Sequence, residues 1–233
     1  MCTVTFLPTT KNNFILTSNR DEQRTRETYF PSKYVEDGIE MLFPKDKTAG
    51  GTWIGVSNNK RLVCVLNGAF VKHTPKDSYT KSRGVIAKDI LKSANFEKFI
   101  HEIDLSFIEP FTMVIVDWNN NSLNLFELIW DYNQKYFNKL KNEPKIWSSS
   151  TLYSVEAKAL RKTWFEKWKA TNEISQESIL NFHHSEIGDK EQSILMKRSY
   201  VETVSITSVE KIASTVKMSY EDVVNSKKVE VVF

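Results

Sequence analysis

The sequence predicts an α+β protein in which helices pack outside largely antiparallel sheets. Short apolar or β-branched runs occur in pairs separated by polar turns, and these pairs alternate along the chain with amphipathic helical segments. The final part of the chain returns to strand character. This order is compatible with a four-layer αββα sandwich, in which helices flank two sheets.

The first half of the chain contains two predicted hairpins. The polar Thr-Thr-Lys-Asn separates the runs at 2–8 and 13–19, and Asn-Asn-Lys separates those at 52–57 and 61–68. We expect both hairpins to belong to one antiparallel sheet. The intervening stretch at 29–38, YFPSKYVEDG, is predicted to be a loop.

Helical periodicity follows each group of strands. Segment 82–93 has one apolar face behind Ser82, a predicted N-cap, and a further helix is predicted behind Asn95. A third strand pair surrounds the Asn-Asn-Asn turn near residue 120. The clearest helix is 154–168, for which we predict a sheet-facing stripe of Ala157, Leu160, Trp164 and Trp168.

Composition predicts one globular domain over residues 1–233 and a small-molecule partner. The chain is 40% apolar, and no Pro/Gly-rich linker divides it. Its net charge of +3 comes from 32 basic and 29 acidic residues that are interspersed, which does not favour nucleic acid. Without a signal peptide or an apolar run of roughly 20 residues, we expect a cytoplasmic protein with no integral membrane insertion. A homodimer is compatible with these features.

The two cysteines differ in context. Cys64 lies in the apolar run RLVCVLNG, where a buried packing role is expected. Cys2 becomes the first residue if Met1 is removed, which places a free α-amine beside a thiol. Neither belongs to a Cys-x-x-Cys pair, so the sequence does not predict a zinc or redox site.

Strand alternation places Cys2, Val4 and Phe6 on one face, and a short hairpin brings Arg20 and Asp21 near Cys2. A nearby guanidinium, or an amine that takes the proton, makes a thiol with an ordinary pKa of about 8.5 a better nucleophile near neutrality. The alternative is a strand end followed by a solvated turn with a local ion pair. Spacing alone leaves both interpretations open.

Several motifs together resemble the Asn-Arg-Asp-Glu family, which includes the transport and Golgi organisation 2 proteins. The motifs are Met-Cys at the start, SNRDE at 18–22, GGTWIGVS at 50–57, Leu-Asn at 66–67 and SRG at 82–84. They cover roughly the first 95 residues. This family is similar to N-terminal nucleophile hydrolases of the cysteine branch, which includes choloylglycine hydrolases and penicillin acylases.

The resemblance implies an αββα sandwich that attacks non-peptide C–N bonds. It makes Cys2 the nucleophile, with Arg20 and Asp21 as its neighbours, and Asn19 a brace for the turn. The second half of the chain departs from the family. Ser150 stands where an oxyanion-binding Asn is expected, and Val204 where some relatives carry Arg. A hydroxyl donates only one hydrogen bond, so these departures argue against efficient stabilisation of the oxyanion and therefore against rapid turnover.

Three further residues have both a structural and a functional interpretation. Trp53 follows a Gly50-Gly51 turn and packs over an entrance or into the core. Asn67, at a strand end, either marks a turn or points its amide at an oxyanion. Arg83, in a first helical turn that disfavours cations, either binds an anion or is solvated.

The pair His183-His184 reads as a solvated loop, because adjacent side chains diverge and no third ligand lies nearby in sequence. We therefore predict no bound metal and no cofactor.

Two functions remain open. The first is an N-terminal-cysteine amidohydrolase or acyltransferase in which Cys2, Arg20, Asp21 and Asn67 are catalytic, while Asn19, Trp53, Arg83 and Ser150 bind substrate. The second is a non-catalytic binder or carrier of an amphipathic ligand such as acyl-CoA or haem, with a trafficking or lipid-homeostasis role, as the family resemblance allows. In the carrier, Arg20 and Arg83 contact carboxylates or phosphates of the ligand.

Overall fold

A computed structural model describes residues 3–10 and 12–233. The chain divides into two compact units, which we describe separately. Unit 1 comprises Met1–Arg26 and Glu143–Phe233, and unit 2 comprises Glu27–Asn142. The expectation of a single domain over residues 1–233 remains a prediction.

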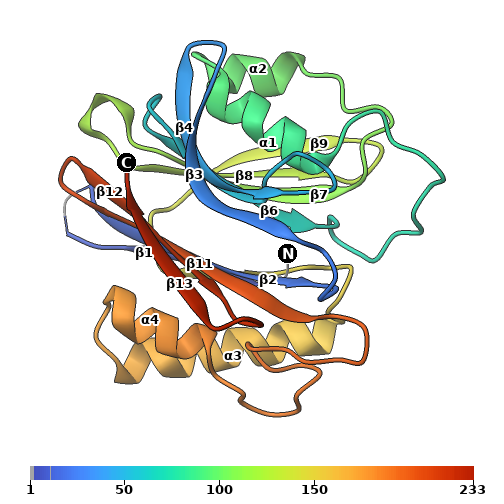
Figure 1. The fold of residues 1–233 in the computed structure, drawn as a ribbon, viewed down its shortest axis with the longest axis vertical. Coiled ribbons are helices and arrows are strands. Elements are labelled where there is room, and N and C mark those ends of the chain that lie inside the picture. Colours follow the sequence, from blue (N-terminus) through green and yellow to red (C-terminus); the bar gives the residue numbers. More distant parts are fainter. Residues whose placement is uncertain (1–2, 11) are drawn as a thin grey trace. The chain divides into compact units, whose positions relative to one another are not determined.

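Unit 1 is built on a six-stranded antiparallel sheet with the order β10-β1-β2-β11-β12-β13. Two helices, α3 (Val155–Thr171) and α4 (Gln176–His183), lie along one face of this sheet (Figure 1). The strands are β1 (Thr3–Pro8), β2 (Phe14–Glu22), β10 (Lys145–Ser148), β11 (Glu202–Ile212), β12 (Thr215–Asp222) and β13 (Lys227–Val232).

Unit 2 is a seven-stranded antiparallel meander in which β3 to β9 follow one another in chain order. Helices α1 (Arg83–Lys92) and α2 (Phe96–Glu102) connect β6 to β7, and a 3-10 turn, Asn119–Asn121, connects β7 to β8. The strands are β3 (Thr28–Glu36), β4 (Ile39–Asp46), β5 (Ile54–Ser57), β6 (Arg61–Asn67), β7 (Phe111–Asp117), β8 (Asn124–Trp130) and β9 (Lys135–Leu140).

The predicted α+β class, with mainly antiparallel sheets, is confirmed. Both predicted hairpins form, as β1–β2 and β5–β6, but they belong to different sheets. The expectation of one common sheet was wrong because β2 pairs with β11, far along the chain, and no local pattern encodes that pairing. Among the described residues, no helix has the length and apolarity required to cross a bilayer.

The stretch predicted to be a loop at 29–38 instead supplies most of strand β3, at the edge of the unit 2 sheet. Its pairing with β4 shifts register between Tyr29 and Ser32, on either side of Pro31. Proline cannot donate a ladder hydrogen bond, so it is tolerated at edges and bulges. The mixed exposure along β3 removed the apolar signal on which strand prediction depends.

Helix starts follow their predicted caps. The side chain of Ser82 accepts a hydrogen bond from Val85 N, and that of Asn95 accepts one from Lys98 N. These bonds satisfy amide donors that a helix N-terminus otherwise leaves unpaired.

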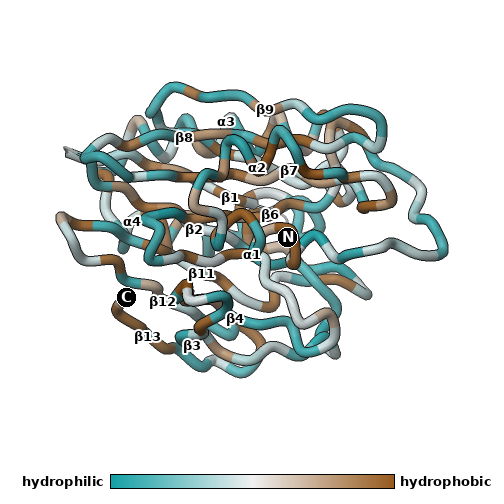
Figure 2. The backbone as a smooth tube through the Cα atoms, turned by 90° about the horizontal axis from the view of Figure 1, so that it is seen from above, coloured by the Kyte–Doolittle hydropathy of each residue, from teal (hydrophilic) through white to brown (hydrophobic). Residues whose placement is uncertain are grey.

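Each unit has its own apolar core beneath its helices. Figure 2 shows hydrophobic positions recurring along the central strands β6, β7 and β8 of unit 2. Cys64 on β6 is fully buried, as predicted. The unit 1 core joins the sheet to α3 and α4 through Leu7, Ile15, Phe165, Trp168, Ile179, Phe182 and Ile194.

The buried face of α3 differs from the predicted stripe. Ala157 and Trp168 are buried as expected, but Leu160 is 46% exposed and Trp164 is only partly buried. The buried residues are Ala157, Arg161, Phe165 and Trp168. Aromatic residues at both 164 and 165 allowed two interpretations of the period, and the predicted one put Arg161 on the outside.

Two glycines from the recognised motifs come into close contact in unit 2. A Cβ atom added to Gly84 would lie 2.6 Å from Thr52 O and 2.8 Å from Thr52 N. A Cβ added to Gly51 would lie 2.8 Å from Gly84 C. The loop before β5 and the first turn of α1 therefore approach more closely than any side chain permits.

We predict that Gly84→Ala destabilises the protein by about 1 to 3 kcal/mol, the range for overpacking. Helix propensity alone predicts the opposite sign, because alanine replaces glycine within a helix. Urea unfolding of the variant and wild type distinguishes the two. A midpoint that rises in the variant would show that the Gly51–Gly84 contact relaxes freely.

Candidate functional site

The predicted site residues are distributed over both units. Unit 1 contains Asn19, Arg20, Asp21 and Ser150, and unit 2 contains Trp53, Asn67 and Arg83. Cys2 lies outside the described residues. Its chain neighbour Thr3 begins β1, is fully buried, and pairs with Asn19 on one side and Ser148 on the other.

Alternation along β1 and β2 separates the polar side chains between two faces of the sheet. Thr5 reaches the helical layer, where its hydroxyl lies 2.8 Å from His183 Nε2. Asn19 reaches the same layer. Asp21 follows two positions later on β2, so its side chain lies on the same face. Arg20 therefore points to the opposite face, where it is 4% exposed. Its Nη1 donates to Arg26 O at 3.4 Å.

The carboxylate of Asp21 is held by two hydroxyl donors. Tyr153 Oη donates to Oδ2 at 2.8 Å, and Thr203 Oγ1 donates to Oδ1 at 2.6 Å. Met196 N in turn donates to Thr203 Oγ1, which fixes the direction of the threonine hydroxyl. Asp21 is 3% exposed, so this is a buried, oriented acceptor. Such a group is suited to orient a nearby donor, such as an amine or a hydroxyl.

Strand β11 is irregular beside this carboxylate. Thr203 pairs with Asp21 and Ser205 with Arg20, so the register shifts at Val204. Bulges of this kind are common next to functional sites because they redirect a side chain. Val204 is buried and offers no side-chain donor.

Ser150 lies in the turn that follows β10 and is 6% exposed. The turn is closed by Tyr153 N, which donates to Ser149 O, and the Ser149 and Thr151 hydroxyls lie 2.9 Å apart. Because β10 pairs with β1, this turn is tied to the strand that starts at Thr3. The role of Ser150 as a substrate-binding residue remains a prediction.

Asn19 braces the helical layer of unit 1. Its Nδ2 donates to His183 O at 3.0 Å and to Ile194 O at 2.9 Å, while its Oδ1 lies 2.7 Å from His183 Nδ1. The expectation of a solvated loop at His183 was wrong, since this residue ends α4 and is fully buried. A short apolar helix that buries its C-terminal histidine has no distinctive sequence signal.

The same contacts determine the protonation of His183. Because both amide hydrogens of Asn19 are directed at carbonyls, Oδ1 must accept from His183 Nδ1–H. Nε2 is then left to accept from the Thr5 hydroxyl. Burial, with smaller contributions from His184 and Arg161, lowers the pKa of His183 to about 3. The imidazole is therefore neutral at physiological pH.

In unit 2, the turn before Trp53 is built as its sequence suggests. Gly50 has a φ of 65°, and Asp46 Oδ1 accepts from Thr48 N and Ala49 N. Trp53 is 5% exposed, and its carbonyl accepts from Val65 N of β6. The motif thus anchors a loop to the sheet, and a substrate-binding role for Trp53 stays a prediction.

The residue after Asn67 and the side chain of Arg83 share one hydrogen-bond acceptor, the carbonyl of Pro110. Gly68 N, directly after Asn67, donates to Pro110 O at 3.0 Å, and Arg83 Nη1 donates to the same oxygen at 3.4 Å. Arg83 also pairs with Glu109 at 3.0 Å, and His73 lies 3.2 Å from that carboxylate. The carboxylate of Glu109 thus offsets the positive charge of Arg83. The sequence had suggested that a bound anion or solvent would do so.

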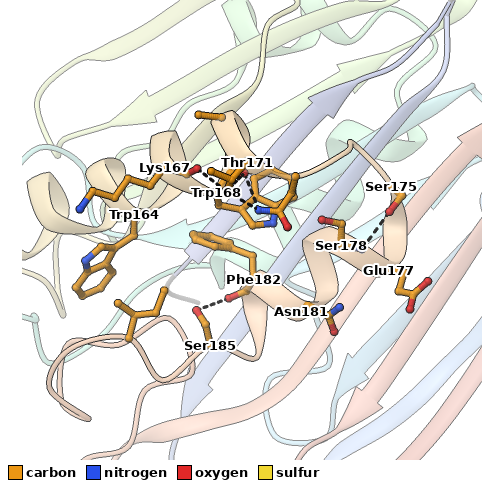
Figure 3. Close-up of a pocket in the computed structure, with 13 residues that line it drawn as sticks. Trp164, Lys167, Trp168, Thr171, Ser175, Glu177, Ser178, Asn181, Phe182 and Ser185 are labelled. Atoms are coloured by element: carbon orange, nitrogen blue, oxygen red, sulfur yellow. Dashed lines mark hydrogen bonds between the residues drawn. The ribbon is translucent and has the colours of Figure 1, made fainter.

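A separate cavity of about 900 Å³ lies on unit 1 between α3 and α4 (Figure 3). Its aromatic lining comes from Trp164, Trp168 and Phe182, and Asn181 and Glu177 contribute polar groups from α4. None of the predicted site residues that the structure describes lines it.

Within the described part of the chain, no group of three His, Cys, Asp or Glu side chains is arranged to hold a metal ion. His184 lies 3.0 Å from Glu221, whereas its neighbour His183 faces Asn19, so the two imidazoles diverge.

Several solved structures share this fold. A conjugated bile acid hydrolase from Clostridium perfringens matches with a TM-score of 0.57 and 9% identity, covering 99% of this chain and 92% of the other. Penicillin V acylase from Agrobacterium tumefaciens gives 0.56 and 11%, covering 99% and 86%. The Caenorhabditis elegans N-acylethanolamine-hydrolyzing acid amidase ortholog gives 0.58 and 11%, covering 89% and 92%. At these identities the likeness establishes the fold class.

The family is identified by sequence. The model of the Transport and Golgi organisation 2 family matches residues 1–230. The chain therefore belongs to this family, as its N-terminal motifs suggested. A search of curated proteins finds no match.

The buried neutral His183 predicts a pH dependence of stability. Between pH 6.5 and about 3 the unfolded state binds a proton at this position and the folded state does not, so stability falls as pH decreases. From pH 6.5 to pH 5 we expect His183 to contribute a loss of roughly 2 kcal/mol.

Urea unfolding of wild type, His183→Gln and the exposed-site control His101→Gln at both pH values measures this contribution. The His183 variant should lose less stability on acidification than wild type, and the control should behave as wild type. Equal pH dependence in all three proteins would contradict the assignment.

Proposed function

We propose that this protein is an N-terminal-cysteine amidohydrolase or acyltransferase that acts on a non-peptide C–N bond or an acyl bond of a small molecule. The observation that carries the proposal is the buried carboxylate of Asp21. Asp21 lies on β2, the strand paired with β1, and its carboxylate is oriented by the hydroxyl groups of Tyr153 and Thr203. Burying a carboxylate costs free energy, so the two hydroxyl donors dedicated to Asp21 suggest that the position of this group matters for function. Cys2 directly precedes Thr3, the first residue of β1.

Each residue has a distinct role in the proposed reaction. The α-amine of Cys2, or a water molecule, takes the thiol proton, and the thiolate attacks the substrate carbonyl. Asp21 orients the amine, and Arg20 favours the thiolate through its positive charge. Backbone N–H groups donate to the oxyanion, and an oxyanion role for Asn67 of unit 2 remains a prediction. As the C–N bond breaks, the proton taken from the thiol passes to the departing amine, and water then hydrolyses the thioester to release the acid and restore the thiol.

The names of the structural relatives are consistent with this chemistry. They include a bile acid hydrolase, a penicillin acylase and an acid amidase. One solved structure is of a bile acid hydrolase mutant in which a cysteine at the second position is alanine. The fold thus accommodates a cysteine at the second position, as in this chain.

A non-catalytic carrier is the second candidate. It is favoured by Ser150 and Val204, which occupy positions where the family resemblance leads one to expect an amide donor and, in some relatives, an arginine. Removal of one oxyanion donor typically lowers turnover by about 100-fold to 1000-fold. In a carrier, Arg20 contacts an anionic group of an amphipathic ligand such as acyl-CoA or haem.

We expect Cys2→Ala to abolish turnover while leaving folding and ligand binding nearly intact. The measurement is an amide and thioester hydrolysis screen, combined with the rate of iodoacetamide alkylation at neutral pH. Alkylation of folded wild type should modify Cys2, because the second cysteine, Cys64, is fully buried. Cys64→Ala serves as the matched thiol control and should retain the labelling.

The two functions give different results. Cys2 alkylated faster than a free thiol, with turnover lost only in Cys2→Ala, supports the enzyme. Alkylation no faster than a free thiol, together with no turnover that depends on Cys2, contradicts it. A carrier would bind ligand equally well with cysteine or alanine at position 2. In a carrier, Arg20→Ala would reduce the binding free energy of an anionic ligand by roughly 1.5 to 3 kcal/mol.

A further inference from the structure

Strand β13 forms one edge of the unit 1 sheet (Figure 1). Phe233 N donates to Val216 O, so these two residues form a hydrogen-bonded pair at the end of the β12–β13 ladder. Hydrogen-bonded and non-hydrogen-bonded pairs alternate along an antiparallel ladder, so the odd-numbered residues of β13 direct their N–H and C=O groups at β12. The backbone groups of Lys228, Glu230 and Val232 therefore face away from β12. Within the part of the chain that the structure describes, no further strand pairs with this open edge.

The other edge strands of the two described sheets carry features that oppose pairing with a further strand. β3 contains Pro31 and a register shift, and β10 has only four residues. On β9 the charged residues, Lys135 and Lys139, are both cationic, so two copies of this strand repel each other. Prolines, bulges, short strands and lysines protect sheet edges in this way. In contrast, β13 has no proline, pairs with β12 without a register shift, and carries charges of both signs.

The charges beside the open edge alternate in sign. Lys228 Nζ lies 3.1 Å from the carboxylate of Glu221 on β12. Glu230 lies 3.3 Å from Lys217 Nζ and accepts a hydrogen bond from the Ser219 hydroxyl. The side chains of Lys228 and Glu230 are nevertheless 70% and 61% exposed. Because an ammonium has three donors and a carboxylate has two acceptor oxygens, each side chain can bind a further group on the open side of the strand.

A second copy of β13 complements this edge in one antiparallel register. Hydrogen bonds between the outward backbone groups require even-numbered residues to lie opposite even-numbered residues. With Val229 on the two-fold axis, Lys228 lies opposite the partner's Glu230, and Glu230 lies opposite the partner's Lys228, at about 5.5 Å between Cα atoms. A shift of two residues in either direction instead places Lys228 opposite its own copy, or Glu230 opposite its own copy, and like charges that face each other are destabilising. The charge pattern therefore selects a single register.

We propose that β13 is the contact surface for a second copy of this chain, which pairs with it around Val229 and continues the unit 1 sheet across a two-fold axis. Glu221, Lys228, the partner's Glu230 and the partner's Lys217 then form a row of alternating charge. One strand from each copy makes a small contact, so the dimer is weak and reversible and forms as protein concentration rises. This inference is independent of the proposed function, because none of the proposed catalytic residues takes part in it.

The test is sedimentation velocity over a series of protein concentrations for wild type, Lys228→Glu and Glu230→Lys. Wild type should change from monomer to dimer as concentration rises. Each reversal replaces two attractive cross-strand pairs by two repulsive ones, so each should raise the dissociation constant by about tenfold or more. Lys162→Glu on α3 and Glu173→Lys after it make the same charge changes at exposed positions, and should leave the constant unchanged.

The two reversals also test the register, because they complement each other. Mixing Lys228→Glu with Glu230→Lys restores two pairs of opposite charge, so a heterodimer should form at a concentration at which neither variant associates with itself. If circular dichroism shows that a reversal does not fold, Lys228→Gln removes one charge from each pair and should also raise the dissociation constant. Wild type that stays monomeric throughout overturns the inference. A dimer that these substitutions do not weaken, or folded reversals that do not associate when mixed, also overturns it.

Discussion

The burial of four consecutive polar residues, Ser18 to Asp21, is the constraint on which unit 1 depends. Each of them is at most 4% exposed, and they lie at the end of β2 between β1 and β11. Buried polar groups destabilise a fold unless they are hydrogen-bonded. The surrounding elements supply the bonds, since Asn19 is held by the end of α4 and Asp21 by Tyr153 and Thr203.

This constraint explains features that otherwise look unrelated. His183 is neutral because burial lowers its pKa, and the neutral imidazole donates from Nδ1 to Asn19 and accepts at Nε2 from Thr5. The register shift at Val204 lies where β11 pairs with Asp21 and Arg20. A segment rich in polar residues thus sets the positions of a helix end and a bulge, which apolar packing alone does not determine.

Much of the fold was predictable because local patterns carry it. Alternation predicted both hairpins, and Ser82 and Asn95 marked their helices by chemistry that acts within one turn. The assignment of hairpins to sheets was not predictable, because the β2–β11 pairing joins residues that are far apart in the chain. Strand β3 was missed since an edge strand with a proline lacks continuous apolar alternation.

The candidate site was predictable in part. The SNRDE segment suggested Arg20 and Asp21, whose catalytic roles remain predictions, but nothing in its spacing indicated the hydroxyl donors from Tyr153 and Thr203 to Asp21. The burial of Arg161 was missed for a different reason. Charged residues on an amphipathic helix are normally assigned to solvent, and the predicted stripe through Leu160 and Trp164 agreed with that assignment. Only the packing of Phe165 toward the core shows that Arg161 faces inward.

Cys2 can act as the N-terminal nucleophile that we propose only if its α-amine is free. The most direct measurement is the intact mass of the protein purified without a tag, supported by sequencing of its first residue. We expect Met1 to be removed and the purified chain to begin at Cys2. A protein that retains Met1 would lack the amine on which the proposed proton transfer and the role of Asp21 depend, and Cys2 would then not be an N-terminal nucleophile.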